Sequence, residues 1–171
     1  MPTIGLPLLA ESGPDPETLG DAHRLYDALN ELLRVVQFRD RDRACCYDVS
    51  VTQCYALKMV VDDGPLTVNE LAGQLYLDKS TASRVADGLR RKGYVDRERD
   101  GADGRIVRLR ATDAGRALCV RIEDDLARAY AEMLEDFDPS VREAMIRLVS
   151  RLAASFAARV ETSGGSCCVV R

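Results

Sequence analysis

Residues 67–110 read TVNELAGQLYLDKSTASRVADGLRRKGYVDRERDGADGRIVRLR, and this stretch decides the fold. Thr67, followed three residues later by Glu70, is the pattern of a capping box. In that arrangement each side chain accepts a hydrogen bond from the backbone N–H of the other residue. Apolar residues then recur at helical spacing, so the sequence predicts a short helix that ends near Leu77.

A second helix is predicted to follow almost at once. Asp78 is the expected N-cap, because its carboxylate can cover the free N–H groups of a helix over Lys79–Lys92. Gly93 is placed to close that helix in a left-handed conformation. Two short helices joined this tightly, with short polar and basic side chains in the first turn of the second, suit insertion into a DNA major groove.

A β-hairpin is predicted directly after these helices. Segments Tyr94–Arg99 and Arg105–Arg110 are compatible with strands, and residues 100–104 between them hold two Gly and two Asp, which favour a turn. Apolar residues alternate with Arg108 and Arg110, so one face can pack and the other can meet phosphate. The predicted fold class is therefore mainly α with a small β-wing. It is a winged helix-turn-helix whose N- and C-terminal helices form a dimerisation region.

Residues 66–115, LTVNELAGQLYLDKSTASRVADGLRRKGYVDRERDGADGRIVRLRATDAG, resemble the MarR family of transcriptional regulators over nearly their whole length. The likeness includes the Asp-x-Arg wing signature at Asp103 and Arg105, and extends more weakly from about Leu25 to Ala153. It implies a homodimeric regulator, expected to be a repressor, whose two recognition helices read a pseudo-palindromic operator in double-stranded DNA.

On this interpretation the wing and the second helix carry the DNA contacts. Arg105 is expected to enter the minor groove, oriented by Asp103. The residues expected to meet bases and phosphates are Lys79, Ser80, Thr81, Ser83 and Arg84.

Charge is distributed in a way that fits this interpretation. The net charge of the 171 residues is −4, unlike a protein that coats nucleic acid indiscriminately. Residues 78–110 contain ten Lys or Arg and six Asp or Glu, which gives +4, and the remainder therefore carries −8. These charges could simply solvate a surface, but they coincide with a complete motif. We call residues 78–110 the reading head and the remainder of the chain the body. A basic reading head on an acidic body favours binding at specific DNA sites over non-specific binding.

The flanking sequence predicts helices that one winged helix cannot cover. Apolar residues recur at helical spacing on both sides of the winged helix, and a helical dimer interface would bury them. No apolar run approaches the length of about 20 residues that spans a membrane, and no signal peptide is expected, so the expected location is the cytoplasm.

The predicted organisation has three parts. They are a flexible arm at 1–15, a MarR-like domain at 16–160 and a flexible cysteine-containing tail at 161–171. Within the MarR-like domain the winged helix is predicted at 50–111 and the dimerisation helices at 16–38 and 112–160.

Six cysteines carry the more specific chemistry. Cys119 lies close to the apolar stripe of its predicted helix and is interpreted as a small core residue. Clustered thiols in a cytoplasmic protein point to metal binding or redox sensing, because stable disulfides are disfavoured there. The clustered residues are Cys45, Cys46, Cys54, Cys167 and Cys168.

Cys45, Cys46 and Cys54 are the candidate metal ligands. Cys54 lies near the start of a helix that Ser50 is expected to cap, where the helix dipole favours a thiolate. Three thiolates without a His or carboxylate partner suit a soft ion, and trivalent arsenic prefers trigonal sulfur coordination, with Hg(II), Cd(II) and Cu(I) as neighbours in softness. The segment CCYDVSVTQC resembles MarR-like regulators associated with arsenic resistance, which implies that these cysteines hold the inducer.

Other interpretations stay open at this stage, the plainest being that all the cysteines merely pack in the fold. Cys54 or Cys46 could instead be the reactive thiol of a peroxide-sensing regulator that needs no metal. Cys167 and Cys168 could form a second thiol pair, or cover the first site from the other subunit. An enzyme is disfavoured, because the chain has one His and neither paired carboxylates nor a phosphate-binding glycine loop. No resident cofactor is expected, and the operator, the regulated genes and the physiological signal cannot be read from the sequence.

Overall fold

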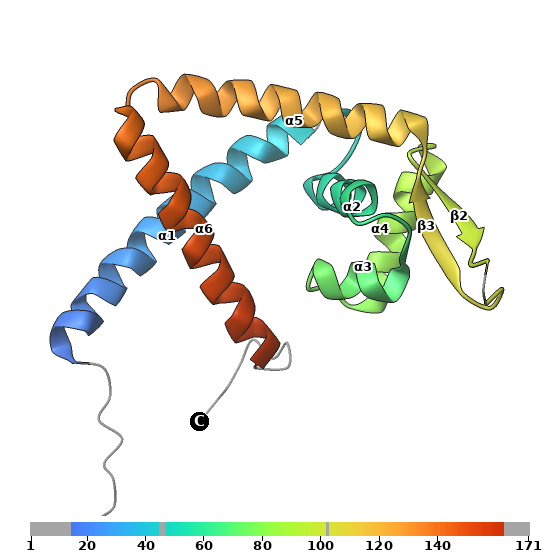
Figure 1. The fold of residues 1–171 in the computed structure, drawn as a ribbon, viewed down its shortest axis with the longest axis horizontal. Coiled ribbons are helices and arrows are strands. Elements are labelled where there is room, and N and C mark those ends of the chain that lie inside the picture. The colour runs from blue at the N-terminus through green and yellow to red at the C-terminus, as the bar shows by residue number, and fades with distance from the viewer. Residues whose placement is uncertain (1–14, 45–46, 102, 163–171) are drawn as a thin grey trace, which may run out of the picture.

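The computed structural model describes residues 15–44, 47–101 and 103–162 of the chain, and it confirms the predicted fold class. The described part is mostly helical and contains one small antiparallel sheet (Figure 1). Its elements in chain order are α1 (Pro16–Ala44), α2 (Val51–Asp62), β1 (Leu66–Thr67), α3 (Val68–Gln74), α4 (Lys79–Arg91), β2 (Val95–Arg99), β3 (Val107–Ala111), α5 (Asp113–Leu134) and α6 (Pro139–Thr162).

Capping boxes begin two of the central helices, as predicted. Thr67 Oγ1 accepts a hydrogen bond from the Glu70 N–H at 3.2 Å, and Glu70 Oε2 accepts one from the Thr67 N–H at 2.7 Å. Ser50 and Gln53 make the same reciprocal pair at the start of α2. Because these bonds satisfy N–H groups that have no partner inside the helix, they fix where α2 and α3 begin.

The end of α4 also follows its sequence signal. Gly93 has a φ of 78°, and its N–H donates to the Arg90 carbonyl at 3.0 Å. The Tyr94 N–H reaches back to the Leu89 carbonyl at 3.1 Å. This pair of bonds is a Schellman motif, in which a left-handed glycine lets the chain reverse and satisfy the last carbonyls of the helix. The chain then enters β2 directly.

The sheet has the strand order β1-β3-β2, with both pairs antiparallel. Arg97 of β2 and Leu66 of β1 both pair with Leu109, which lies in the central strand. The sequence analysis missed β1, because two residues are too few for an alternating pattern. This short strand matters for the architecture, since it ties the start of α3 to the wing hairpin.

One hydrophobic core lies inside the winged helix. Side chains from α2, α3, α4, the sheet and the first half of α5 meet there. Cys119 is 5% exposed within this core, so its interpretation as a small packing residue is confirmed. The largest fully buried side chains are Leu57, Leu71, Leu89, Val95 and Leu109.

Helix α1 is longer than predicted. The sequence analysis ended it at Phe38, before the charged run of residues 39–43, but the structure continues it to Ala44. No Gly or Pro interrupts residues 39–44, and Arg and Ala are good helix formers, so alternating charge was not a sufficient signal for a break. Helix α5 ends at Leu134, and α6 begins five residues later at Pro139.

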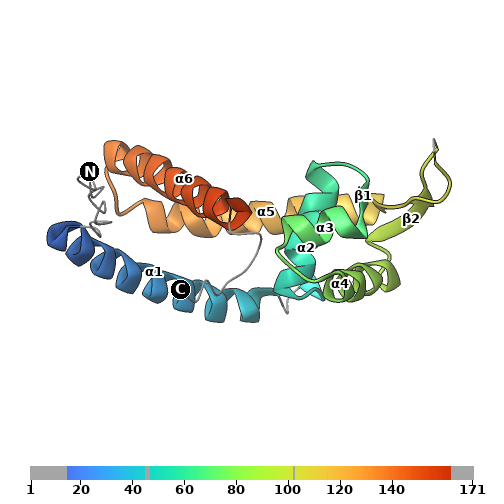
Figure 2. The ribbon, with the colours of Figure 1, turned by 90° about the horizontal axis from the view of Figure 1, so that it is seen from below.

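Helices α1, α5 and α6 extend away from the winged helix and form an open frame (Figure 1, Figure 2). Helix α5 runs out of the winged helix, α6 folds back from its far end, and α1 lies across from them. Many large apolar side chains on this frame are exposed in the single chain. They include Leu25, Leu32 and Leu33 of α1, Tyr130 and Met133 of α5, and Ile146, Leu148, Val149 and Phe156 of α6.

Candidate nucleic-acid interface

Helix α4 presents its polar first turn on the surface of the winged helix. Lys79, Ser80 and Arg84 are exposed, whereas Thr81 and Ser83 are half-buried. The opposite side of the helix, with Ala82, Ala86 and Leu89, is buried in the core. The predicted contact residues therefore share one end of a helix whose apolar side is anchored, which is the arrangement that a recognition helix needs.

Asp78 organises that first turn. Its carboxylate accepts hydrogen bonds from the Thr81 N–H at 2.9 Å, the Ser80 hydroxyl at 2.5 Å and the Thr81 hydroxyl at 2.7 Å. These bonds, those from the hydroxyls foremost, hold the pKa of Asp78 well below its usual range. Thr81 Oγ1 in turn accepts a hydrogen bond from Arg84 at 2.8 Å. Thr81 thus serves the cap, and Lys79 and Arg84 are the more available contacts.

The wing tip is shaped by two aspartates in succession. Asp100 Oδ1 accepts a hydrogen bond from the Asp103 N–H at 3.3 Å, and Asp103 Oδ1 accepts one from the Arg105 N–H at 2.9 Å. Asp103 thus fixes the backbone of Arg105, while the Arg105 side chain is exposed at the tip. The structure supplies a physical basis for the Asp-x-Arg signature: the aspartate shapes the turn that displays the arginine.

Arg108 and Arg110 differ from the sequence expectation, which had them facing phosphate. Arg110 donates to Glu98 on the neighbouring strand with both Nε, at 2.7 Å, and its terminal nitrogen, at 2.6 Å. Arg108 Nε donates to Asp100 Oδ2 at 2.5 Å, and a terminal nitrogen lies 3.4 Å from Glu70 Oε2. The Arg110–Glu98 pair depends on how the two strands align, and the partners of Arg108 lie in the wing turn and in α3, so neither set of contacts could be predicted from local sequence.

The ten cations of residues 78–110 therefore fall into two groups. We call a cation held when an acidic side chain of the described residues pairs with it, and free when none does. The held cations are Arg90, Lys92, Arg97, Arg108 and Arg110. The free cations are Lys79, Arg84, Arg91, Arg99 and Arg105. The sequence analysis did not single out Arg91 and Arg99, and only the pairing of their neighbours identifies them.

Arg108 also connects the wing to the helix-turn-helix. A terminal nitrogen of Arg108 donates to the Pro65 carbonyl at 3.3 Å, while Glu70, which it approaches, caps α3. Asp100 at the base of the wing turn completes the set. One guanidinium thus joins the wing turn, the chain before β1 and the first turn of α3, and no sequence motif marked it.

The candidate thiol site is only partly described. Cys54 lies in α2, half-buried against the core, close to the helix start that Ser50 caps. Its predicted partners Cys45 and Cys46, and the pair Cys167 and Cys168, lie outside the described residues. Within the part of the chain that the structure describes, no three His, Cys, Asp or Glu side chains are grouped closely enough to hold a metal ion.

Cys119 is a different kind of thiol. Burial, followed by the charge of Glu123, raises the pKa of Cys119 to about 11, and the nearby Cys54 also contributes. A thiol that stays protonated at neutral pH is a poor metal ligand and a poor nucleophile. Of the two described cysteines, Cys54 is the more exposed, which fits its predicted place as an ion ligand better than the place of Cys119 does.

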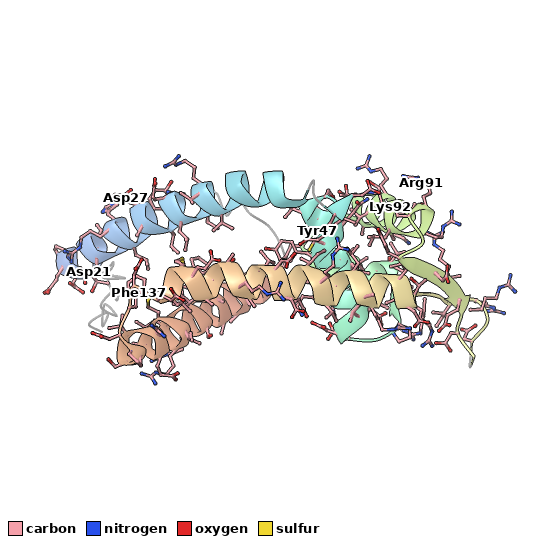
Figure 3. All side chains as sticks on the ribbon, turned by 90° about the horizontal axis from the view of Figure 1, so that it is seen from above. Asp21, Asp27, Tyr47, Arg91, Lys92 and Phe137 are labelled. Atoms are coloured by element: carbon pink, nitrogen blue, oxygen red, sulfur yellow. The ribbon has the colours of Figure 1, made fainter. Side chains whose placement is uncertain are left out.

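The frame carries a hollow where α5 and α6 meet. Its volume is about 370 Å³, and its lining is almost entirely apolar. Figure 3 labels Phe137 at the turn between these two helices. The lining residues are Tyr130, Met133, Leu134, Met145, Ile146, Val149 and Ser150. None of the described helices is both long enough and apolar enough to cross a membrane.

Comparison with known proteins agrees with this geometry. The family model described as "MarR family" matches residues 47–106, which hold α2 to the wing tip. The chain is 27% identical over 128 residues to the HTH-type transcriptional regulator YxaD of Bacillus subtilis, covering 75% of this chain and 90% of that protein.

Solved structures show the same fold. A MarR family protein from Bacillus stearothermophilus superimposes with a TM-score of 0.73 at 26% identity, covering 85% of this chain and 99% of that one. The structure of Streptococcus pneumoniae FabT in complex with DNA superimposes with a TM-score of 0.67 at 20% identity, covering 80% of this chain and 98% of that one.

Proposed function

We propose that this chain is a winged-helix transcriptional regulator of the MarR type, and that it works as a homodimeric, cytoplasmic repressor that leaves its operator when a thiophilic ion binds its cysteines. Trivalent arsenic is the proposed inducer, and Hg(II), Cd(II) and Cu(I) are the chemically related candidates. The single observation that carries the DNA half of the proposal is the anchored α4 with its exposed polar first turn.

DNA binding is supported by the position of the free cations. They lie on α4 and on the wing, the two elements that a winged helix presents to the major and minor grooves. FabT, which shares the fold, has been solved with DNA bound. Asp78 and Asp103 support these elements from behind, because each accepts hydrogen bonds that fix the backbone next to a free cation.

Dimerisation is supported by the exposed apolar faces of the frame. Leu118 and Ile122 of α5 are buried in the winged helix, but Tyr130 and Met133 further along the same stripe are exposed. Monomeric soluble proteins rarely expose large contiguous apolar patches. A second copy of the chain would bury the α5–α6 hollow and the apolar side of α1, and would place two α4 helices on one duplex.

The sensory half rests on sequence chemistry and on the place of Cys54. In the sequence Cys45 and Cys46 fall between α1 and α2, and Cys54 lies in the first turns of α2. Tyr47 and Asp48 belong to the described part of the α1–α2 turn. An ion clamped by the three thiolates would restrain that turn, which joins the frame to the winged helix. DNA binding by a dimer requires the spacing of its recognition helices to match the helical repeat, so a small rotation at this point lowers affinity.

The test is an operator gel shift with a duplex from the promoter of the protein's own gene. Arsenite, Cd(II), Hg(II) and peroxide are titrated against the wild type, Cys54→Ser and, as a matched control, Cys119→Ser. Arsenite should release the wild type and Cys119→Ser but not Cys54→Ser. Release of Cys54→Ser by arsenite would reject the three-thiol site. Native mass spectrometry would count the ions bound per subunit, and light scattering would give the oligomeric state.

Peroxide separates the arsenic response from its redox rival. A regulator that works by cysteine oxidation releases DNA with peroxide in the absence of any metal, and a thiol reductant reverses the release. Release by peroxide alone, with arsenite inactive, would replace the proposed inducer with an oxidant. That outcome would leave the DNA-binding half intact.

A further inference from the structure

The turn between α1 and α2 is attached to two other helices by long-range contacts. The Tyr47 hydroxyl donates a hydrogen bond to Asp125 of α5, and the Arg121 guanidinium lies 5.1 Å from the centre of the Tyr47 ring. The next residue, Asp48, has a left-handed backbone with a φ of 57°. Its carbonyl oxygen accepts a hydrogen bond from the Lys92 ammonium. Figure 3 labels Tyr47 and Lys92 at this part of the molecule.

Lys92 is the C-cap of the recognition helix α4 and directly follows its last residue, Arg91. Besides the bond to the Asp48 carbonyl, its ammonium donates to Gln53 Oε1 at 3.2 Å and lies 3.6 Å from Asp48 Oδ1. Gln53 Oε1 also accepts the Ser50 N–H at 3.1 Å in the capping box of α2. One oxygen atom therefore joins the start of α2 to the end of α4.

Gly88 allows this approach. A Cβ atom on Gly88 would lie 2.3 Å from Gln53 Nε2, far inside contact distance. Glycine is unfavourable in the interior of a helix, so its presence in α4 is explained by the amide that lies against it. We call the set Asp48, Gln53, Gly88 and Lys92 the junction lock.

We propose that the junction lock couples the orientation of the recognition helix to the α1–α2 turn, with Lys92 as the positioning residue. Lys92 needs no contact with DNA for this role. Exposed ion pairs add little stability, so the role of the lock is to fix the orientation of α4 rather than to stabilise the fold. The apolar packing between α2 and α4 has no such directional bonds. The idea that the lock transmits the effect of ion binding at the cysteines to the DNA-binding helix rests on the function proposed above.

Coupling is reciprocal, so it can be measured from the DNA side without any ion. If α4 and the turn are coupled, DNA binding at α4 slows amide hydrogen exchange in residues 47–54. The probe is the promoter duplex of the protein's own gene, bound to the full-length protein. We expect slowing of at least about 5-fold in the wild type, the lower end of usual coupling.

Lys92→Met removes the ammonium but keeps most of the apolar stem. The slowing in residues 47–54 should be lost in Lys92→Met and restored in Lys92→Arg, which can donate to the same oxygens. Arg90→Met is the matched control, because it removes a charge from the same end of α4, where the one acidic side chain of the described residues that pairs with Arg90 is Asp87 at 3.7 Å. A thermal melt establishes that each variant folds.

A second variant keeps the proposal testable if Lys92→Met does not fold. Gly88→Ala favours the helix but displaces the Gln53 amide, so it should weaken the coupling by a different route. Unchanged slowing in Lys92→Met, or no slowing of residues 47–54 in a wild type whose α4 is protected by DNA, would overturn the proposal. A wild type that binds the duplex but ignores arsenite would reject only the thiol switch. A wild type that does not bind the duplex would reject both proposals.

Discussion

Replacing Arg105 with alanine tests whether the wing tip neutralises a DNA phosphate. Arg105 is exposed and is held by no acidic side chain of the described residues. Each neutralised phosphate contributes about −0.9 to the slope of log affinity against log salt. A homodimer carries two copies of Arg105, so the substitution should flatten the slope by about 1.8.

The starting slope follows from the five free cations of each subunit. If all ten in a dimer meet phosphate, the slope is about −9, and affinity falls about 3 × 10⁵-fold between about 50 and 200 mM salt. The Arg105→Ala dimer, with a slope of about −7.2, should lose about 2 × 10⁴-fold over the same range. Fluorescence anisotropy of a labelled promoter duplex at a series of salt concentrations measures both slopes.

Arg110→Ala is the matched control, because it removes the same charge from β3, the strand that follows the wing turn. Both nitrogens that Arg110 directs at Glu98 are already engaged, at 2.7 Å and 2.6 Å, so the slope should not change. A slope as flat as that of Arg105→Ala would show that the ion pair opens for DNA and would refute the division into held and free cations. A full slope in Arg105→Ala would show that the wing tip does not touch phosphate.

Three further predictions concern stability and thiol chemistry. Gly115→Ala would place a Cβ atom 2.1 Å from a backbone carbonyl oxygen, so urea unfolding should show a loss of about 1–3 kcal/mol, whereas Gly20→Ala, with nothing within 4 Å, should be neutral or stabilising. Because the pKa of Asp78 is lowered in the folded state, its contribution to stability is complete above about pH 4 and is lost as the pH falls further. Asp78→Asn caps without titrating, so urea midpoints compared at about pH 5 and pH 3 should fall less in that variant; an equal fall would contradict this. With a pKa of about 11, against 9.0 for an ordinary thiol, Cys119 holds about a hundredth of the usual thiolate. Mass spectrometry after brief alkylation of the native protein should find Cys54 modified and Cys119 intact, and the reverse order would exclude the assignment of roles.

Local signals in the sequence were enough to predict the helix-turn-helix. The side chains of Thr67 and Asp78 cap the N-termini of the two helices, and Gly93 ends the second helix. These interactions span three or four residues, so a single sequence contains all the information that they require. The fold class followed from them, and the structure confirms it.

Contacts between distant residues could not be predicted in the same way. Lys92 and Asp48 are 44 residues apart, and Arg108 and Glu70 are 38 apart, so neither pair leaves a local pattern. The two-residue strand β1 exists only because Leu66 finds Leu109 across the sheet. For the same reason the sequence could place ten cations near the DNA but could not separate the held from the free.

The held cations bear on how an acidic chain could carry the selective DNA-binding surface that we propose. Five of the ten cations in the reading head are paired with acidic side chains, which orders the wing and the end of α4. The body of the chain, with a net charge of −8, repels any duplex that is not docked at the free cations. In the dimer that we propose, non-specific affinity would then be low, and specific affinity would depend on two α4 helices held at the correct spacing. On this proposal a small rotation at the α1–α2 turn would release the protein, because few other contacts would retain it on DNA.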